Sequence, residues 1–153
     1  MPSFATSRTV RHSATDMFDL VADVERYPDF VPLCTGLSVR SSRNDGERRL
    51  LIAAMTVAYG PLKETFTSRV IVDRAARTIR AENVDGPFRH LESAWSFEPM
   101  GEDRCTVRFA IAYEFRSRLL AGVMGGLFDR AFHAFADAFE ARADAVYGTS
   151  ATA

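Results

Sequence analysis

The sequence contains little cysteine and histidine, which argues against a fold held together by disulfides and against a zinc site. Its two cysteines, Cys34 and Cys105, are too few for a disulfide scaffold and show no CxxC or cysteine–histidine spacing for zinc. The three histidines lie far apart, and none has a cysteine or histidine three or four residues away. We therefore predict no metal site and a reducing compartment, the cytoplasm.

Long apolar runs and an excess of positive charge are also missing. The longest stretch without charged or strongly polar side chains in the C-terminal third is 119–128. Crossing a bilayer core takes about 20 apolar residues, so this stretch is too short. Because 19 basic and 20 acidic residues leave a net charge of −1, no overall positive field would hold a polyanion. We do not expect DNA as a partner.

Motifs for catalysis are absent as well. The chain has no G-x-S-x-G, HExxH, P-loop or G-x-G-x-x-G sequence, so hydrolase, zinc protease and nucleotide-binding functions lack support. General acid–base chemistry needs two titratable groups in one cleft, and most acidic residues fall on positions predicted to face solvent. We predict no catalytic residue and a protein that is not an enzyme.

What the sequence does have is the composition of a globular domain rich in phenylalanine. The 153 residues are 47% hydrophobic and 25% charged, which is average for a soluble folded protein. We expect one domain over residues 1–148 and a disordered tail over 149–153. Twelve phenylalanines against one tryptophan and four tyrosines indicate an interior lined by rings with few hydrogen-bonding groups.

Most of the chain alternates between apolar and polar residues, as strands do. A strand is predicted from about 4 to 12, and Ser13 with Asp16 forms a helix start that resembles a capping box. Prolines 28 and 32 leave room for at most one further helical turn between them. Strands broken by turn residues then predict an antiparallel meander, over 37–43, 48–59, 65–73, 78–84, 91–97 and 104–115.

The last stretch is predicted to be helical from Leu127 to Tyr147, with Gly148 as the stop. Its apolar face carries four rings spaced four, three and four residues apart, namely Phe128, Phe132, Phe135 and Phe139. Three glycines at 122, 125 and 126 weaken helix formation upstream. We therefore interpret residues 121–127 as a frayed first turn or a mobile apolar loop.

These elements predict an α+β architecture, in which a curved antiparallel sheet with a short helical segment after its first strand wraps around a long C-terminal helix. Alternate residues of the last strand, from Cys105 to Phe115, share one face with Trp95 of the preceding strand. Together with the phenylalanine stripe, this inward surface either packs as a filled core or lines an apolar cavity. Both interpretations remain open at this point.

Three separated motifs resemble the coenzyme Q-binding family of the START-like, polyketide cyclase-like superfamily. The first is Tyr27-Pro-Asp-Phe-Val-Pro-Leu-Cys34, directly after the amphipathic helix. The second is Lys63-Glu-Thr-Phe-Thr-Ser-Arg69. The third is Asp85-Gly-Pro-Phe-Arg-His-Leu91, followed by Trp95-Ser-Phe97. The resemblance covers about residues 3–147.

The resemblance implies a helix-grip fold with a hydrophobic tunnel between sheet and helix. It also implies binding of ubiquinone or a similar isoprenoid lipid as a ligand, with no other cofactor. The protein would be a lipid chaperone that supports respiratory electron transport. Bacterial members are similar to a toxin of a toxin–antitoxin pair that blocks association of the ribosomal subunits, so the ribosome is a second possible partner. A polyketide cyclase or dehydratase is a third interpretation.

We expect the ligand in a tunnel whose entrance contacts the surface of the inner membrane to collect it. Trp95 offers one indole donor for a quinone carbonyl, or is an ordinary core residue. Arg40, Arg43, Arg48 and Arg49 around one hairpin would be the ribosome-facing patch, or a solvated turn. The predicted ligand-binding residues are Phe66, Trp95, Phe97, Val107, Phe109, Ile111, Phe128, Phe132 and Phe135. The predicted gate consists of Tyr27, Pro28, Phe30, Val31, Pro32, Val123, Met124 and Leu127.

Overall fold

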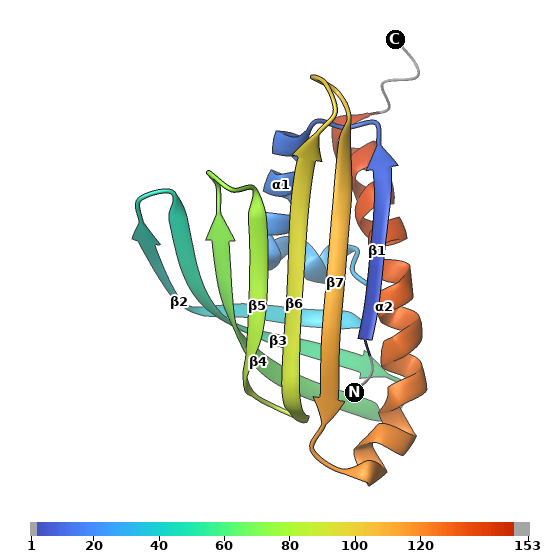
Figure 1. Cartoon of the computed structure of the whole chain (residues 1–153). Coiled ribbons are helices and arrows are strands. Elements are labelled where there is room, and N and C mark those ends of the chain that lie inside the picture. The colour runs from blue at the N-terminus through green and yellow to red at the C-terminus, as the bar shows by residue number, and fades with distance from the viewer. Residues whose placement is uncertain (1–2, 149–153) are drawn as a thin grey trace.

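The computed structural model describes residues 3–148 and shows a strongly curved sheet with a long helix along its concave side (Figure 1). The predicted tail, 149–153, lies outside the described residues. The strands are β1 (Ser3–Val10), β2 (Cys34–Asp45), β3 (Arg48–Tyr59), β4 (Leu62–Asp73), β5 (Thr78–Asp85), β6 (Phe88–Pro99) and β7 (Cys105–Phe115). The helices are α1 (Ala14–Ala22), the 3-10 helix η1 (Val24–Asp29) and α2 (Arg118–Tyr147).

All seven strands belong to one antiparallel sheet in the order β1-β7-β6-β5-β4-β3-β2. The six strands from β2 to β7 pair with their neighbours in sequence, which confirms the predicted meander. β1 completes the sheet beside the last strand, with Ser3 opposite Ala112 and Val10 opposite Cys105. The two ends of the meander are therefore far apart, and β2 and β1 form the edges of the sheet.

The short helix begins where the sequence predicts. The Ser13 side chain accepts a hydrogen bond of 3.0 Å from the Asp16 backbone N–H, which satisfies a free donor of the first turn of α1. The further helical turn is η1, which contains Pro28 and ends at Asp29, so no full turn forms between Pro28 and Pro32 and the predicted limit of one turn holds. A 3-10 helix accepts proline there because its φ is close to the value fixed by the pyrrolidine ring.

The long helix begins nine residues before the predicted start at Leu127. Ser117 caps it by accepting a hydrogen bond of 3.1 Å from the Leu120 N–H, and the helix continues through the three glycines. The prediction of a frayed turn or loop over 121–127 is therefore wrong. Burial of Met124 against the sheet outweighs the glycines' low helix propensity. The predicted stop is confirmed, because Gly148 is the C-cap at φ 79°.

Ion pairs hold the later part of α2 against β1. The Arg8 guanidinium lies 2.8 Å from the Asp137 carboxylate and 2.9 Å from that of Glu140. These contacts fix how the phenylalanine stripe of α2 lies above the concave face of the sheet. Within residues 3–148, no helix has both the length and the apolar character that crossing a membrane requires.

Candidate ligand-binding cavity

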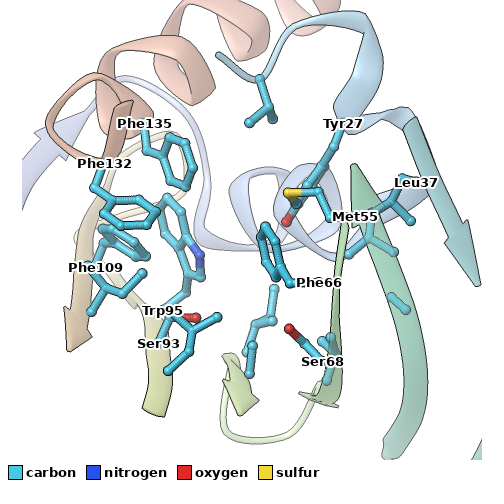
Figure 2. A pocket seen from close by; sticks show the side chains of 18 of the residues that line it. Tyr27, Leu37, Met55, Phe66, Ser68, Ser93, Trp95, Phe109, Phe132 and Phe135 are labelled. Atoms are coloured by element: carbon cyan, nitrogen blue, oxygen red, sulfur yellow. The ribbon is translucent and has the colours of Figure 1, made fainter. Parts of the chain in front are cut away.

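A cavity of about 110 Å³ lies between the concave face of the sheet, the η1 segment and α2 (Figure 2). Strands β2 to β7 supply its floor and walls, and α2 supplies the phenylalanines above it. Most of the surrounding surface is apolar. The lining residues are Val24, Tyr27, Val31, Leu37, Ala53, Met55, Phe66, Ser68, Val70, Ile79, Ala81, Leu91, Ser93, Trp95, Phe109, Ile111, Phe132, Phe135 and Phe139.

One wall of the cavity is a cluster of aromatic rings drawn from the sheet and the helix. The Trp95 indole lies with its centroid 4.4 Å from that of Phe109 and 4.9 Å from that of Phe139. Phe109 in turn lies 6.0 Å from Phe135 on the helix. Rings at these separations attract one another in tilted and edge-to-face arrangements, so the wall keeps its shape. Such a surface favours a flat or unsaturated apolar ligand.

Three polar groups interrupt the apolar lining. Figure 2 shows the hydroxyl oxygens of Ser68 and Ser93 and the indole nitrogen of Trp95 on the cavity walls. Among residues 3–148, the structure shows no hydrogen bond from these three groups to another protein group. All three groups face the cavity, so a ligand atom that accepts a hydrogen bond can pair with them, and one such bond contributes about 1 kcal/mol. The cavity therefore suits a ligand with hydrogen-bond acceptors at one end.

Tyr27 closes the cavity on the side of η1. Its hydroxyl donates a hydrogen bond to the Val21 carbonyl at the end of α1. Burial raises the pKa of this phenol well above its usual value, so the hydroxyl stays protonated at neutral pH. The Tyr27 ring meets that of Phe139 edge to face at 5.3 Å, which joins η1 to α2 across the cavity.

Six of the nine residues predicted to bind the ligand lie on the cavity wall, namely Phe66, Trp95, Phe109, Ile111, Phe132 and Phe135. The other three do not. Phe97 packs edge to face against Phe18 of α1 at 5.9 Å, and Val107 is its buried neighbour on β7. Phe128 lies one turn before Phe132 and packs against Phe88 and Phe115. These three inward positions are filled by packing and do not line the cavity.

Some of the predicted gate residues line the cavity and others do not. Tyr27 and Val31 line the cavity, whereas Pro28, Phe30 and Pro32 do not. Phe30 instead packs edge to face on Phe139 at 5.1 Å. From α2, Val123 is exposed, and Met124 and Leu127 line a separate small hollow. The second half of the predicted gate therefore lies outside the cavity.

Several lining residues were missed by the sequence analysis because it followed only the last two strands. The same alternation places Ser68 and Val70 of β4 on the face of the predicted residue Phe66, so extending it would have found these two. Gly86 was also missed as a support of the wall. A Cβ at this residue would lie 2.6 Å from the Cβ of Phe66, and its φ is 140°. Only glycine allows this close approach.

Comparison with known proteins places the chain in a family. Residues 10–140 match the family model described as polyketide cyclase/dehydrase and lipid transport. The chain is 36% identical over 143 residues to the ribosome association toxin RatA of Pseudomonas aeruginosa, covering 93% of this chain and 95% of that one. It is 34% identical over 149 residues to the coenzyme Q-binding protein COQ10 homolog B of Xenopus laevis, covering 95% of this chain and 59% of that one.

The fold also matches solved structures. A START superfamily protein from Mycobacterium smegmatis superposes with a TM-score of 0.79 at 22% identity, covering 94% of this chain and 98% of that one. This likeness confirms the predicted START-like fold of a curved sheet and a long C-terminal helix. The matched family model confirms the resemblance found in the three sequence motifs. The chain therefore belongs to the polyketide cyclase/dehydrase and lipid transport family.

Proposed function

We propose that the protein is a non-enzymatic binder of a ubiquinone-like isoprenoid quinone, whose ring occupies the cavity. The observation that carries this proposal is the combination of an apolar cavity with three unpaired polar groups, from Ser68, Ser93 and Trp95. A quinone ring has an apolar face for the aromatic wall and carbonyl oxygens that accept hydrogen bonds. Similarity to the coenzyme Q-binding protein COQ10 homolog B supports the same ligand class.

The volume of the cavity favours the quinone ring, and not the isoprenoid tail, as the group that occupies it. Its volume of about 110 Å³ is of the order of the ~150 Å³ that binds benzene in a dry apolar protein cavity. A polyprenyl chain of several units is larger than this space, so we infer that the tail extends beyond the cavity. Removal of apolar ligand surface from water contributes about 25 cal/mol per Å².

The lining favours binding over catalysis. Among the described residues that line the cavity, Tyr27 is the one titratable group. Because burial raises the pKa of its hydroxyl, Tyr27 does not exchange a proton near neutral pH. A cyclase or dehydratase would need an acid or base at the reacting carbon. This lining gives the cyclase interpretation little support.

The test uses the single tryptophan, Trp95, as a reporter inside the cavity. Titration with a ubiquinone carrying one isoprene unit should quench its fluorescence to saturation at one quinone per chain. Ser68→Ala and Ser93→Ala should each weaken the affinity about fivefold, since one hydrogen bond contributes about 1 kcal/mol. The matched control is Ser96→Ala, on β6 beside Trp95, whose side chain points to the opposite face of the sheet.

A second readout uses a ligand without carbonyls. Toluene, an aromatic ring without a hydrogen-bond acceptor, should bind with the same dissociation constant to the wild type and to the two serine variants. Quenching that never saturates, or that changes as much in Ser96→Ala as in Ser68→Ala, would overturn the proposal. So would an organic extract of the natively purified protein that contains a stoichiometric lipid of another class.

A ribosome-directed function is the second candidate, favoured by one observation on the sheet. The hairpin of β2 and β3 extends away from the body (Figure 1) and carries four arginines near its tip. Arg48 pairs with Asp73 at 3.5 Å, and Arg49 donates to Ser42 at 3.2 Å. Arg40 and Arg43 have no ion-pair partner within residues 3–148. Similarity to the toxin RatA supports this candidate.

Gradient co-sedimentation with ribosomal subunits tests the second candidate. Contacts between arginines and phosphates release counterions, so co-sedimentation should be present at low salt and decrease as salt rises. The double variant Arg40→Glu/Arg43→Glu should abolish it at both salt concentrations while leaving quinone quenching unchanged. If the wild type fails to sediment with subunits even at low salt, this candidate is rejected.

A further inference from the structure

Exposed apolar side chains gather at the end of the molecule where α2 begins. Leu119 is 77% exposed and Val123, one turn later on the same face, is 51% exposed. Tyr59, at the turn between β3 and β4, is 61% exposed. Tyr59 also lines a small hollow together with Met124 and Leu127 of the helix, which lie one residue and one turn after Val123. We call the surface formed by Tyr59, Leu119, Val123 and Leu127 the α2-end patch.

Cations without an ion pair outnumber carboxylates without one around the patch. Arg118 and Lys63 flank the patch on the helix and the hairpin, and Arg130 follows one turn after its last helical residue. None of these three cations is ion-paired with any residue between Ser3 and Gly148. Of the nearby carboxylates, Asp85 pairs with Arg116 at 3.4 Å and Asp129 lies 3.7 Å from His133, whose ring is charged only when protonated. Glu64, beside Lys63, has no ion pair among residues 3–148. From residue 117 to 128 the chain has no acidic residue.

Three glycines lie on the helix beside the patch. Gly122, Gly125 and Gly126 have no positive φ, and a Cβ added to each would meet no atom within 4 Å. Neither backbone conformation nor close approach therefore requires glycine here. Because glycine has no side chain, this side of α2 presents only backbone at these positions, and the side chains of Leu119 and Val123 project beyond it.

The patch adjoins the cavity. Val31 lines the cavity, and Leu33, two residues later, lines the hollow under the patch with Met124. On the helix, Phe128 stacks on Phe132 at 5.8 Å, and Phe132 lines the cavity. Only one layer of side chains thus separates the exposed apolar surface from the ligand site.

We propose that the α2-end patch docks onto a lipid surface that carries anionic headgroups. Leu119, Val123 and Tyr59 would enter the interface, with Arg118 and Lys63 against the headgroups. The biological reason for docking rests on the proposed function, since an isoprenoid quinone resides in a bilayer. The physical grounds do not, because exposed apolar side chains with unpaired cations beside them suit this surface whatever the cavity binds.

Vesicle flotation without any quinone tests the docking. The wild-type chain should float with vesicles of phosphatidylcholine and phosphatidylglycerol, and less with phosphatidylcholine alone. Leu119→Ser/Val123→Ser should lower the partition coefficient on the order of 100-fold, because two apolar side chains no longer leave water. Arg118→Glu should lower it about tenfold on the anionic vesicles only. The matched control is Met100→Ser/Val146→Ser, which changes two apolar residues that are 54% and 50% exposed at the other end of the molecule.

Each outcome separates docking from quinone binding. Flotation lost in Leu119→Ser/Val123→Ser, with saturable quenching of Trp95 by the short quinone intact, supports docking and shows a folded cavity. If the wild type does not float, or if this variant and the control float equally, docking is overturned while quinone binding stands. A dimer of the wild type that the same variant dissociates also overturns it, since a second copy would then cover the patch. Flotation without quinone quenching leaves docking in place and rejects the proposed function.

Discussion

His12, two residues after β1, donates a hydrogen bond of 2.6 Å from Nε2 to the carboxylate of Asp144 near the end of α2. The His12 side chain is buried, whereas that of Asp144 is partly exposed. With the pairs of Arg8 to Asp137 and Glu140, this bond fastens the later part of α2 to the first strand. It therefore helps to hold the helical phenylalanines over the cavity.

Loss of this bond should destabilise the fold. We expect His12→Ala to lower the free energy of unfolding by about 2 kcal/mol, because it removes a buried ring and a charge-assisted hydrogen bond. Urea unfolding followed by circular dichroism measures the change. His133→Ala is the control, since His133 is half exposed and bonds to the Asp129 carbonyl of its own helix. That control should change stability by less than about 0.5 kcal/mol. Equal losses in both variants would contradict a special role for His12.

The strands were predictable because turn residues bracket them. The predicted limits of 48–59 match β3, since Gly46 precedes it and Gly60-Pro61 follows it. Other strands extend further than predicted, and β2 runs over Cys34–Asp45 against the predicted 37–43. Hydrogen bonding to β3 continues through two irregularities in register, which local alternation does not reveal. Pairing with a neighbour therefore sets the ends of these strands.

The start of α2 was not predictable from propensity, because tertiary burial outweighs it. Gly122, Gly125 and Gly126 argue against helix, yet Met124 among them is 3% exposed. Which inward-facing residues line the cavity was likewise not predictable from the local sequence. Alternation places Phe97 and Phe109 on the same inward face, but only Phe109 lines the cavity. Phe97 meets α1 instead, and the curvature of the sheet that decides this is not a local property.

The glycines of α2 should be replaceable with a gain in stability. Gly122→Ala and Gly126→Ala should each raise the free energy of unfolding by about 1 kcal/mol, since alanine favours helix and its Cβ meets open space. Urea unfolding measures both. The reversed control is Ala121→Gly on the same exposed turn, which should lower stability by about as much. Unchanged stability in the two alanine variants would mean that the helix is not formed there in solution.

Gly86 should tolerate no side chain. Gly86→Ala combines a φ of 140° with a Cβ 2.6 Å from that of Phe66, so we expect a loss of about 3 kcal/mol. Since Phe66 lines the cavity and packs on Phe88 at 5.5 Å, quinone quenching of Trp95 should weaken as well. Gly46→Ala separates the two causes, because its φ is 63° and its Cβ would meet nothing within 4 Å. It should cost only about 1 kcal/mol and leave quenching unchanged. Similar effects of both variants would exclude the contact with Phe66 as the cause.

Cys105 should make the free energy of unfolding decrease at alkaline pH. Burial raises the pKa of its thiol from 9.0 to about 11. The folded state therefore keeps this proton at a pH where the unfolded chain has released it. The resulting stabilisation is fully present below pH 9.0 and is lost as the pH rises toward 11, by roughly 3 kcal/mol in total.

The contribution of Cys105 is measured as a difference between two pH profiles. Burial also raises the pKa of Tyr27, Tyr113 and the Cys34 thiol, so the wild type loses stability from several groups at once. Cys105→Ala removes one of them and leaves the others. Its free energy of unfolding should start lower, because a buried side chain is truncated, and should fall less steeply between pH 9 and 11 than that of the wild type. Parallel profiles would show that the Cys105 thiol ionises as readily in the folded chain as in the unfolded one. They would contradict the burial of this side chain.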